Sequence, residues 1–481
     1  MKKGQRVTGK VVAMEFPNKG WVLLSPEENE GITEPVRLRV ANAVLGQKVE
    51  CFVKRSRKEK AEGSLLSVLE FSDLEKNTDL CPHFGICGGC LFQRLPYDTE
   101  VELKQNLIRD LLLPVLEKET YLAVDEGIAK SPRWEHYRNK MEFTFGDEYK
   151  EGPLSLGLHK KNSFYDIVNT TGCRICEADM NRVLSVTTDY FRSREVSYYH
   201  RLRHTGFLRH LLVRQTVTKE LLVDLITSGE EPVWRDPKGV EKQGTEELLE
   251  GWKDALLEEF GPQGITGILH TINTREADVV EDHGTRILYG RDYIEEQLLE
   301  LTFKITPFSF FQTNSRGAEV LYSVVRDFIR EAVDHPATVY DLYSGTGTIA
   351  QIMADVSDRV IGVEIVEEAV RAARENAQKN GLSNCEFLAG DVLKVLDEIR
   401  EKPDFIILDP PRDGVHPKAL KKILEYGVSS MIYIACKPSS LARDLPAFFA
   451  AGYEVRRLKA VDMFPRTANC EVCCLLTKTS C

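Results

Sequence analysis

Short apolar runs alternate with stretches of helical character after about residue 303, and this alternation restricts the fold more than any other feature of the sequence. Strands separated by helices of about ten to fifteen residues are typical of a doubly wound, mostly parallel sheet. We therefore predict an α/β fold for residues 303–481. The apolar runs are VYDLYSG, VIGVEI, CEFLAGD, DFIILDP, MIYIAC, YEVRRLKAVD and EVCCLLTK.

Acidic residues end four consecutive strands of this predicted sheet. They are Asp341, Glu364, Asp391 and Asp409. One such carboxylate could simply cap a helix, but four in order, with a glycine turn at Gly345 and Gly347, indicate a ligand site at the carboxyl edge of the sheet. Glu364 stands about 20 residues beyond the turn, where a carboxylate can accept both hydroxyls of a ribose. Because this turn lacks the GxGxxG pyrophosphate motif, the pattern favours a nucleoside, and S-adenosylmethionine is the candidate cofactor.

Cys436 follows the fifth apolar run, at the same predicted edge. A free cysteine is most often a small hydrophobe in a core, but a thiol at this edge, before a helix that begins near Ser439, can act as a nucleophile. A nucleophile beside a methyl donor fits methylation of uracil, because thiolate addition at C6 makes C5 nucleophilic. A base must then remove the C5 proton, and Glu471, which opens the last predicted strand, can supply it.

The sequence of the first 300 residues indicates folds other than a doubly wound sheet. Residues 1–72 contain short alternating strands broken by Gly, Pro and Asn, which are typical of a small β-barrel. Residues 121–302 mix strand-like runs with acidic helical ones. The net charge of -11 argues against nucleic acid, yet residues 130–219 hold sixteen Lys and Arg against ten Asp and Glu, and KRSRKEK at 54–60 is a second basic cluster. Each cluster is either a solvated face or a contact surface for RNA.

Three of the twelve cysteines lie within ten residues, at Cys81, Cys87 and Cys90. No secretion signal and no run of about 18 apolar residues are present, so we expect reduced thiols in the cytoplasm and no membrane segment. Cys87 and Cys90 with Cys173 and Cys176 would form a zinc site. The three clustered cysteines with one distant cysteine would instead hold an iron-sulfur cluster. The spacing alone leaves both open.

The sequence resembles the RNA 5-methyluridine (uracil-C5) methyltransferase family. The resemblance implies Cys436 as the nucleophile and Glu471 as the base. The cofactor contacts, including Gly345 from the glycine turn, are then expected to be Gln312, Tyr343, Gly345, Glu364, Asp391 and Asp409. Many relatives have serine and asparagine where this chain has Ala435 and Lys437 beside the thiol. The matching segments are YRNK at 137–140, GFLRHLLVR at 206–214, PFSFFQTN at 307–314, DLYSGTGTIA at 341–350, DPPR at 409–412, IACKPSSLARDL at 434–445 and VDMFPRTANCE at 461–471.

The resemblance also implies the domain organisation. Residues 1–72 resemble a TRAM domain, an OB-like barrel that binds RNA. Residues 73–97 and 121–302 would form an α+β central domain that holds the cluster and binds RNA. Residues 98–120 and 303–481 would form a Rossmann-like S-adenosylmethionine-dependent methyltransferase domain.

The resemblance also selects the ligands of a 4Fe-4S cluster. In cluster-bearing members an Ile-Val pair precedes the downstream cysteine, as Ile167-Val168 precede Cys173. The implied ligands are Cys81, Cys87, Cys90 and Cys173. Cys176 is then a packed thiol.

Three alternative functions fit the sequence less well. Amino-group methyltransferases place an aromatic residue after the two prolines, where Arg412 stands, and cytosine-C5 methyltransferases place a cysteine in that motif. A non-catalytic iron-sulfur RNA-binding protein would leave Cys436 and Glu471 unexplained. The barrel and the cluster resemble the members of the family that act on 23S ribosomal RNA, whereas tRNA members usually lack both. We therefore expect a 23S rRNA uridine as the target, with tRNA as the alternative and more than one site allowed, and a monomeric enzyme.

Overall fold

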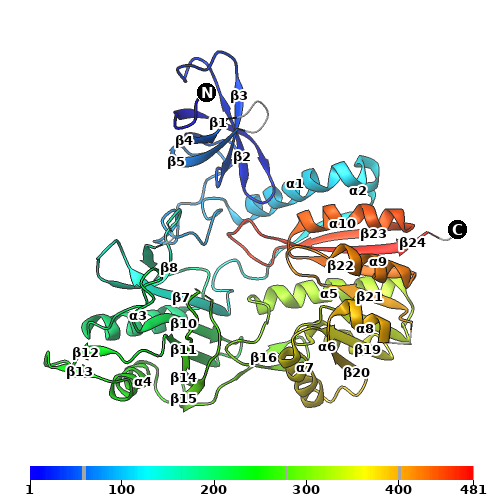
Figure 1. Cartoon of the computed structure of the whole chain (residues 1–481). Helices are drawn as coiled ribbons and strands as arrows, with labels where there is room; N and C mark the ends of the chain where they lie inside the picture. Colours follow the sequence, from blue (N-terminus) through cyan, green and yellow to red (C-terminus); the bar gives the residue numbers. More distant parts are fainter. Residues whose placement is uncertain (57–60, 164, 278, 399–401, 480–481) are drawn as a thin grey trace. The chain divides into compact units, whose positions relative to one another are not determined.

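The computed structural model describes residues 1–56, 61–163, 165–277, 279–398 and 402–479 (Figure 1). The chain divides into two compact units. One contains Met1–Leu80, Cys90–Lys130 and Pro410–Cys481, and the other contains Cys81–Gly89 and Ser131–Asp409. This division follows compactness alone and does not test the three functional domains expected from the sequence, which stay predictions.

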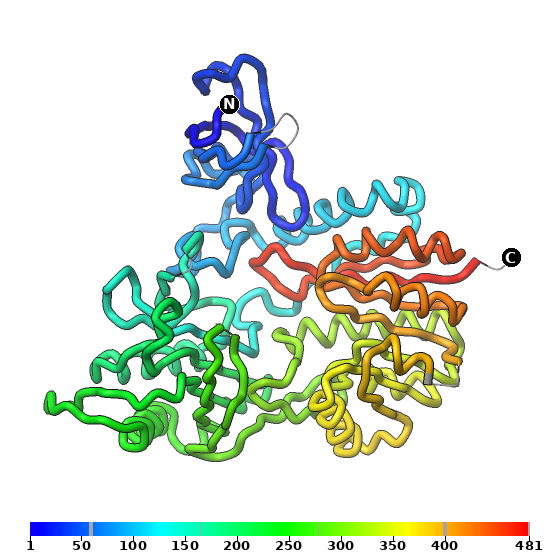
Figure 2. The backbone as a smooth tube through the Cα atoms, in the orientation of Figure 1, coloured from blue at the N-terminus to red at the C-terminus, as the bar shows by residue number. Residues whose placement is uncertain are grey.

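A closed β-barrel opens the first unit, drawn in blue in Figure 2. Its strand order is β1-β2-β3-β5-β4. Alternate side chains point inward, among them Val22, Leu38 and Val49, and these are fully buried. The small barrel predicted for the N-terminal segment is confirmed. Of the basic cluster, Lys54 and Arg55 are exposed, and 57–60 lie outside the described residues. The strands are β1 (Arg6–Glu15), β2 (Lys19–Leu24), β3 (Val36–Ala41), β4 (Lys48–Arg55) and β5 (Glu62–Glu70).

The rest of the first unit is built on four paired strands. β24 (Glu471–Lys478) pairs antiparallel with β22 (Ser430–Ala435) on one side and with β23 (Tyr453–Val461) on the other, and β23 pairs parallel with β6 (Asp125–Ala129). All six residues of β22 are buried, so this strand is a core strand. The last strands of the chain are thus antiparallel, which a mostly parallel sheet allows but which the sequence did not predict for these strands. The helices of this part are α1 (Tyr97–Leu116), α2 (Lys118–Val124), α9 (Pro417–Glu425) and α10 (Pro438–Ala450).

A seven-stranded sheet forms the first part of the second unit, with the order β15-β14-β11-β10-β7-β8-β9. The helices α3 (Ala178–Ser193) and α4 (Glu246–Phe260) pack together, and the indole of Trp252 donates to Thr187 at 3.1 Å between them. This is the α+β insert that the sequence predicted. The sheet strands are β7 (Lys140–Asp147), β8 (Leu154–His159), β9 (Ile167–Asn169), β10 (Leu208–Gln215), β11 (Leu221–Thr227), β14 (Gly267–Ile272) and β15 (Thr285–Gly290). Two further hairpins are β12 (Val233–Arg235) with β13 (Glu241–Gln243), and β16 (Ile294–Leu298) with β17 (Leu301–Ile305).

Four parallel strands with intervening helices complete the second unit, in the order β20-β19-β18-β21. Every residue of β18 and β21 is buried, as expected of parallel strands covered on both faces. The doubly wound, Rossmann-like arrangement predicted from the sequence is confirmed. The elements are α5 (Ser315–Ala332), β18 (Thr338–Leu342), α6 (Thr348–Ile352), η1 (Met353–Asp355), β19 (Arg359–Glu364), α7 (Glu367–Lys379), β20 (Cys385–Ala389), α8 (Val392–Glu398) and β21 (Phe405–Leu408).

Candidate active site

The glycine turn follows β18 and runs into α6. Tyr343, Gly345 and Gly347 have φ angles of 69°, 54° and 72°, a left-handed region that favours glycine. A Cβ atom on Gly347 would lie 2.5 Å from the ring of Phe387, so only glycine fits there. The N–H of Tyr343 donates to the carbonyl of Val363 at 3.0 Å and ties the turn to the end of β19. The backbone of the turn is therefore held in a defined conformation, and Gly345 and Gly347 add no side chains to it.

Glu364 ends β19 beside this turn. Its carboxylate accepts the N–H of Gly345 at 3.0 Å and the N–H of Val366 at 2.9 Å. The structure thus brings together Gly345 and Glu364, two of the residues predicted to bind the cofactor. Two charge-assisted bonds hold the carboxylate in one orientation at the carboxyl edge of the sheet.

Asp341 and Asp409 add two more carboxyl groups at this edge, within β18 and after β21. Asp341 is fully buried, and its Oδ2 accepts the N–H of Ala350 at 3.0 Å. Among the described residues its Oδ1 has no hydrogen-bond partner. Burial raises the pKa of Asp341 to about 8, helped by the charges of Asp409 and Glu364, and burial raises the pKa of Asp409 to about 7. This excess of carboxyl groups suits a ligand that carries positive charge.

Asp341 was expected at the ligand edge of the sheet as the first of the four acidic strand ends, but it was not among the residues named as cofactor contacts. The structure indicates a role for Asp341 because this residue is fully buried and one of its carboxyl oxygens has no hydrogen-bond partner among the described residues. Asp391 has a simpler surrounding, because its Oδ1 accepts the N–H of Leu393 at 2.8 Å in the first turn of α8. A bond of this kind normally caps the N-terminus of a helix and requires no ligand. A role of Asp391 in cofactor binding therefore stays a prediction.

Gln312 lies in the loop 307–314, which other elements of the unit hold in place. The Asn139 side chain donates to the carbonyl of Gln312 at 2.9 Å, and its backbone N–H donates to the carbonyl of Thr313 at 2.9 Å. The buried Arg214 donates to the carbonyl of Pro307 at 3.1 Å and to the carbonyl of Ser309. Burial lowers the pKa of Arg214 to about 9.

The loop is also tied to the glycine turn, because the Thr346 hydroxyl donates to the carbonyl of Phe310 at 3.1 Å. The segments YRNK and GFLRHLLVR, whose roles were not predicted, therefore position the Gln312 loop through Asn139 and Arg214. For Arg214 the signal would have been a basic residue in a strand with many apolar residues, whereas Asn139 lies in the polar segment YRNK before β7 and had no such signal.

Cys436 and Glu471 belong to the first unit. Cys436 is partly exposed and directly follows β22, and Lys437 caps α10, whose first residue is Pro438. Glu471 is buried, with 3% of its surface exposed, and is the first residue of β24. Since Ala435 pairs with Val472, Cys436 and Glu471 are the next residues at that end of the strand pair. The structure brings the predicted nucleophile and the predicted base together.

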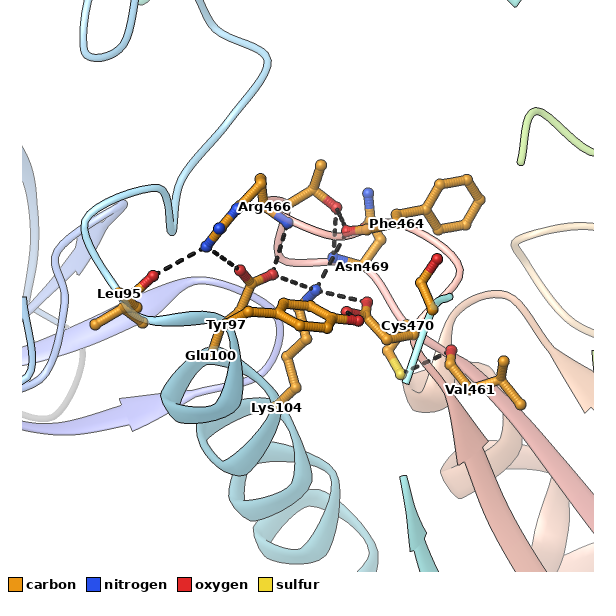
Figure 3. A network of polar contacts seen from close by, with 12 residues as sticks. Leu95, Tyr97, Glu100, Lys104, Val461, Phe464, Arg466, Asn469 and Cys470 are labelled. Atoms are coloured by element: carbon orange, nitrogen blue, oxygen red, sulfur yellow. Dashed lines mark hydrogen bonds and ion pairs between the residues drawn. The ribbon is translucent and has the colours of Figure 1, made fainter. Parts of the chain in front are cut away.

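The loop 462–470 leads from β23 into Glu471, and buried charges from α1 hold it (Figure 3). Lys104 contacts both Glu100 and Asp462 at 2.8 Å. The backbone N–H of Arg466 donates to Glu100 at 2.6 Å. The family resemblance grouped residues 98–120 with 303–481, but these particular ion pairs between the helix and the loop were not predicted.

Three of the predicted cluster ligands lie in the second unit. The segment of Cys81 and Cys87 is held to that of Cys173 by a 2.7 Å hydrogen bond between the His83 ring and the carbonyl of Thr171. A hydrogen bond between the Cys81 and Cys173 thiols raises the pKa of Cys81. Cys90 belongs to the other unit.

The predicted ligands do not form a metal centre in the part of the chain that the structure describes. Within the described ranges, no group of three or more His, Cys, Asp or Glu side chains could hold a metal ion. Cys176 is fully buried, and its thiol donates to the carbonyl of Cys173 and to the Asn181 side chain, both at 3.6 Å. These bonds agree with the prediction of a packed thiol.

Comparisons with known proteins bear on the methyltransferase prediction. Residues 334–464 match the family described as "Methyltransferase domain". An uncharacterized RNA methyltransferase of Caldanaerobacter subterraneus subsp. tengcongensis is 43% identical over 481 residues, all of both chains, and one of Clostridium tetani is 42% identical over 98% of this chain and 97% of its own. The chain belongs to the RNA methyltransferase family.

One solved structure resembles this RNA methyltransferase over almost its whole length. It is the Pyrococcus abyssi tRNA (uracil-54, C5)-methyltransferase in complex with S-adenosyl-L-homocysteine, with a TM-score of 0.70, 22% identity, and coverage of 98% of this chain and 100% of that chain. At this identity the likeness supports the fold alone. In the described part of the methyltransferase, no helix is both long and apolar enough to cross a membrane.

Proposed function

We propose that this RNA methyltransferase transfers a methyl group from S-adenosylmethionine to C5 of a specific uridine in RNA. The observation that carries the proposal is the register of β22 and β24, which makes a partly exposed thiol and a buried carboxylate neighbours at one strand end. Methylation of an unactivated ring carbon needs both groups. Methylation of an amino group needs no thiol, so Cys436 would have no task in that reaction.

In the proposed reaction Cys436 acts as a thiolate and forms a bond from Sγ to C6 of uracil, which makes C5 nucleophilic. When bound, S-adenosylmethionine supplies the methyl group that C5 accepts. Glu471 then removes the C5 proton, the electron pair of the C5–H bond restores the C5–C6 double bond, and the bond from Sγ to C6 breaks. Cys436 is thereby regenerated.

The cofactor is proposed to lie against the glycine turn after β18. In this proposal the Glu364 carboxylate accepts hydrogen bonds from the ribose hydroxyls, and Gly345 allows the ligand to approach the backbone of the turn. Asp341 and Asp409 would compensate the positive charge of the sulfonium and amino groups. Tyr343, Gln312 and Asp391 are proposed as further contacts, on the family resemblance.

The substrate is proposed to be 23S ribosomal RNA, with the N-terminal barrel as a TRAM-like RNA-binding domain. The solved structure of similar fold belongs to a tRNA enzyme, and this keeps tRNA as the second candidate. Mapping 5-methyluridine in ribosomal RNA and tRNA from a strain that lacks the gene separates the two. We expect loss from 23S rRNA. Loss confined to tRNA would refute the ribosomal assignment, and no loss from either would refute uridine C5 methylation.

A 4Fe-4S cluster on Cys81, Cys87, Cys90 and Cys173 is proposed as a structural group. The contact between the Cys81 and Cys173 thiols supports it, and so do the hydrogen bonds of Cys176, which leave that thiol engaged with Asn181. The zinc pairing through Cys176 is the alternative. The monomeric state and the cytoplasmic location also stay predictions.

A further inference from the structure

Lys104 is a buried lysine on α1 that the proposed chemistry does not use. Only 1% of its surface is exposed, and its Nζ lies 2.8 Å from Glu100 Oε1 and 2.8 Å from Asp462 Oδ1. It also donates to the carbonyl of Phe464 at 3.2 Å (Figure 3). Burial by itself would lower the pKa of Lys104, but the two carboxylates raise it above its usual range, so the ammonium is charged.

Arg466 and Tyr97 complete this group of side chains. Arg466 has a φ angle of 68°, and its guanidinium donates to Glu100 at 3.3 Å and to the carbonyl of Leu95 at 2.9 Å. The Tyr97 hydroxyl donates to Asp462 at 3.0 Å. The two carboxylates, Glu100 and Asp462, balance the two cations, Lys104 and Arg466. Charges can be buried at a tolerable cost in free energy only when they are paired in this way.

These contacts all act on the loop 462–470. Asp462, Phe464 and Arg466 are fixed by α1, a helix about 360 residues earlier in the chain. At the far end of the loop the Cys470 thiol donates to the carbonyl of Val461 at 3.1 Å. The next residue is Glu471, the first residue of β24, so the conformation of the loop affects where this carboxylate lies. Cys436 follows β22, a different element from the loop.

We propose that Lys104, together with Glu100, is a positioning residue that fixes the loop 462–470 and so aims Glu471 at the C5 proton. The inference rests on the proposed function, in which Glu471 is the base. When the loop is displaced, Cys436 still adds to C6 and C5 still accepts the methyl group. The C5–H bond is no longer broken, so the bond from Sγ to C6 stays and the methylated RNA remains attached to the protein.

The test uses the full-length protein, total RNA from a strain that lacks the gene, and S-adenosylmethionine with a radiolabelled methyl group. The readouts are product turnover and the label that stays on the protein after denaturation and nuclease digestion. The variants are Lys104→Met and the charge-balanced Glu100→Gln with Lys104→Met. Tyr97→Phe removes only one hydroxyl and keeps the test usable if the others do not fold.

Gln105→Met is the matched control, because it removes a polar contact of the same helix, the 2.7 Å bond to Asp125 on β6, which is outside the loop. Glu471→Gln is the reference. We expect turnover to fall about 100-fold in Lys104→Met, as for a base displaced by about 1 Å, and about fivefold in Tyr97→Phe, as for one lost hydrogen bond. Label accumulates on the protein in both, while Gln105→Met resembles the natural protein.

The outcomes separate the two proposals. If Glu471→Gln retains label and the folded variants of Lys104 or Tyr97 do not, the positioning role is overturned while the proposed chemistry survives. If Glu471→Gln itself neither retains label nor loses turnover, the proposed base is wrong. Loss of turnover without retained label in every folded variant of the loop contacts would show a general structural effect and would also overturn the positioning role.

Discussion

Ala435 and Val472 pair across the antiparallel strands β22 and β24, and the residues beside them at that strand end are Cys436 and Glu471. Opposite residues of an antiparallel pair have Cα atoms about 4.5–5.5 Å apart. Strand pairing therefore makes a thiol and a carboxylate from segments 35 positions apart in the sequence neighbours. The proposed reaction needs this pair to act in sequence on one ring, Cys436 at C6 and Glu471 at C5.

Replacing Glu364 should weaken cofactor binding. Glu364→Gln keeps the size of the side chain but removes the charge that would bind the ribose hydroxyls, and a charge-assisted hydrogen bond contributes about 1.5–3 kcal/mol. We expect the Kd for S-adenosylmethionine, measured by calorimetry, to rise about 10- to 100-fold. Glu367→Gln, in the exposed first turn of α7, is the control and should bind normally. Equal affinity of both variants would show that Glu364 serves only the turn.

The buried carboxyl groups predict a pH dependence. The pKa values of Asp341, about 8, and Asp409, about 7, lie above the value of about 3.9 for an unfolded Asp. The folded protein therefore holds protons that the unfolded chain has lost, and these groups lower the stability of the unliganded protein as pH rises from about 4 to 8. The positive charge on the sulfonium of bound S-adenosylmethionine should favour the ionised forms of Asp341 and Asp409.

The affinity for S-adenosylmethionine relative to S-adenosylhomocysteine, which lacks the sulfonium charge but keeps the amino group, should therefore rise between about pH 6 and 8. The ratio of the two Kd values, measured across this range, tests the prediction. Asp409→Asn should flatten the dependence. A ratio that does not change with pH in the natural protein would contradict the role given to these carboxylates.

The cluster makes a prediction about metal content. Protein purified without oxygen should be brown and contain about four irons per chain. Cys173→Ala should lose the iron, and the matched Cys176→Ala should keep it, since the Cys176 thiol already bonds within its own loop. Colourless protein with one zinc, lost from Cys176→Ala, would instead establish the zinc pairing.

The buried charges around Lys104 predict a large effect on stability. Lys104→Met leaves Glu100 and Asp462 buried beside each other without their common partner, and breaking a buried ion pair costs about 3–5 kcal/mol. Urea denaturation should show a loss of this size in the free energy of unfolding. The double variant with Glu100→Gln should recover part of it, because one of the two carboxylates is then neutral. A loss below about 1 kcal/mol in Lys104→Met would mean that the site is hydrated in solution.

The sequence predicted what depends on local patterns. Alternating apolar runs predicted the barrel and the parallel strands, and the acidic strand ends predicted the positions of Glu364 and Asp409. It did not predict that β24 inserts between β22 and β23, because the periodicity of a strand does not say which other strands it pairs with. Nor could it connect Lys104 with Asp462, since long-range ion pairs depend on how helices pack.

The most direct test of the central claim is the identity of the residue that becomes attached to RNA. RNA containing 5-fluorouridine carries fluorine where Glu471 would remove a proton, so the methylated adduct should persist and mass spectrometry should find the nucleotide on the peptide that contains Cys436. Cys436→Ala should form no adduct and no 5-methyluridine while it still binds S-adenosylmethionine. Methylation by Cys436→Ala, or an adduct on any other residue, would contradict the account.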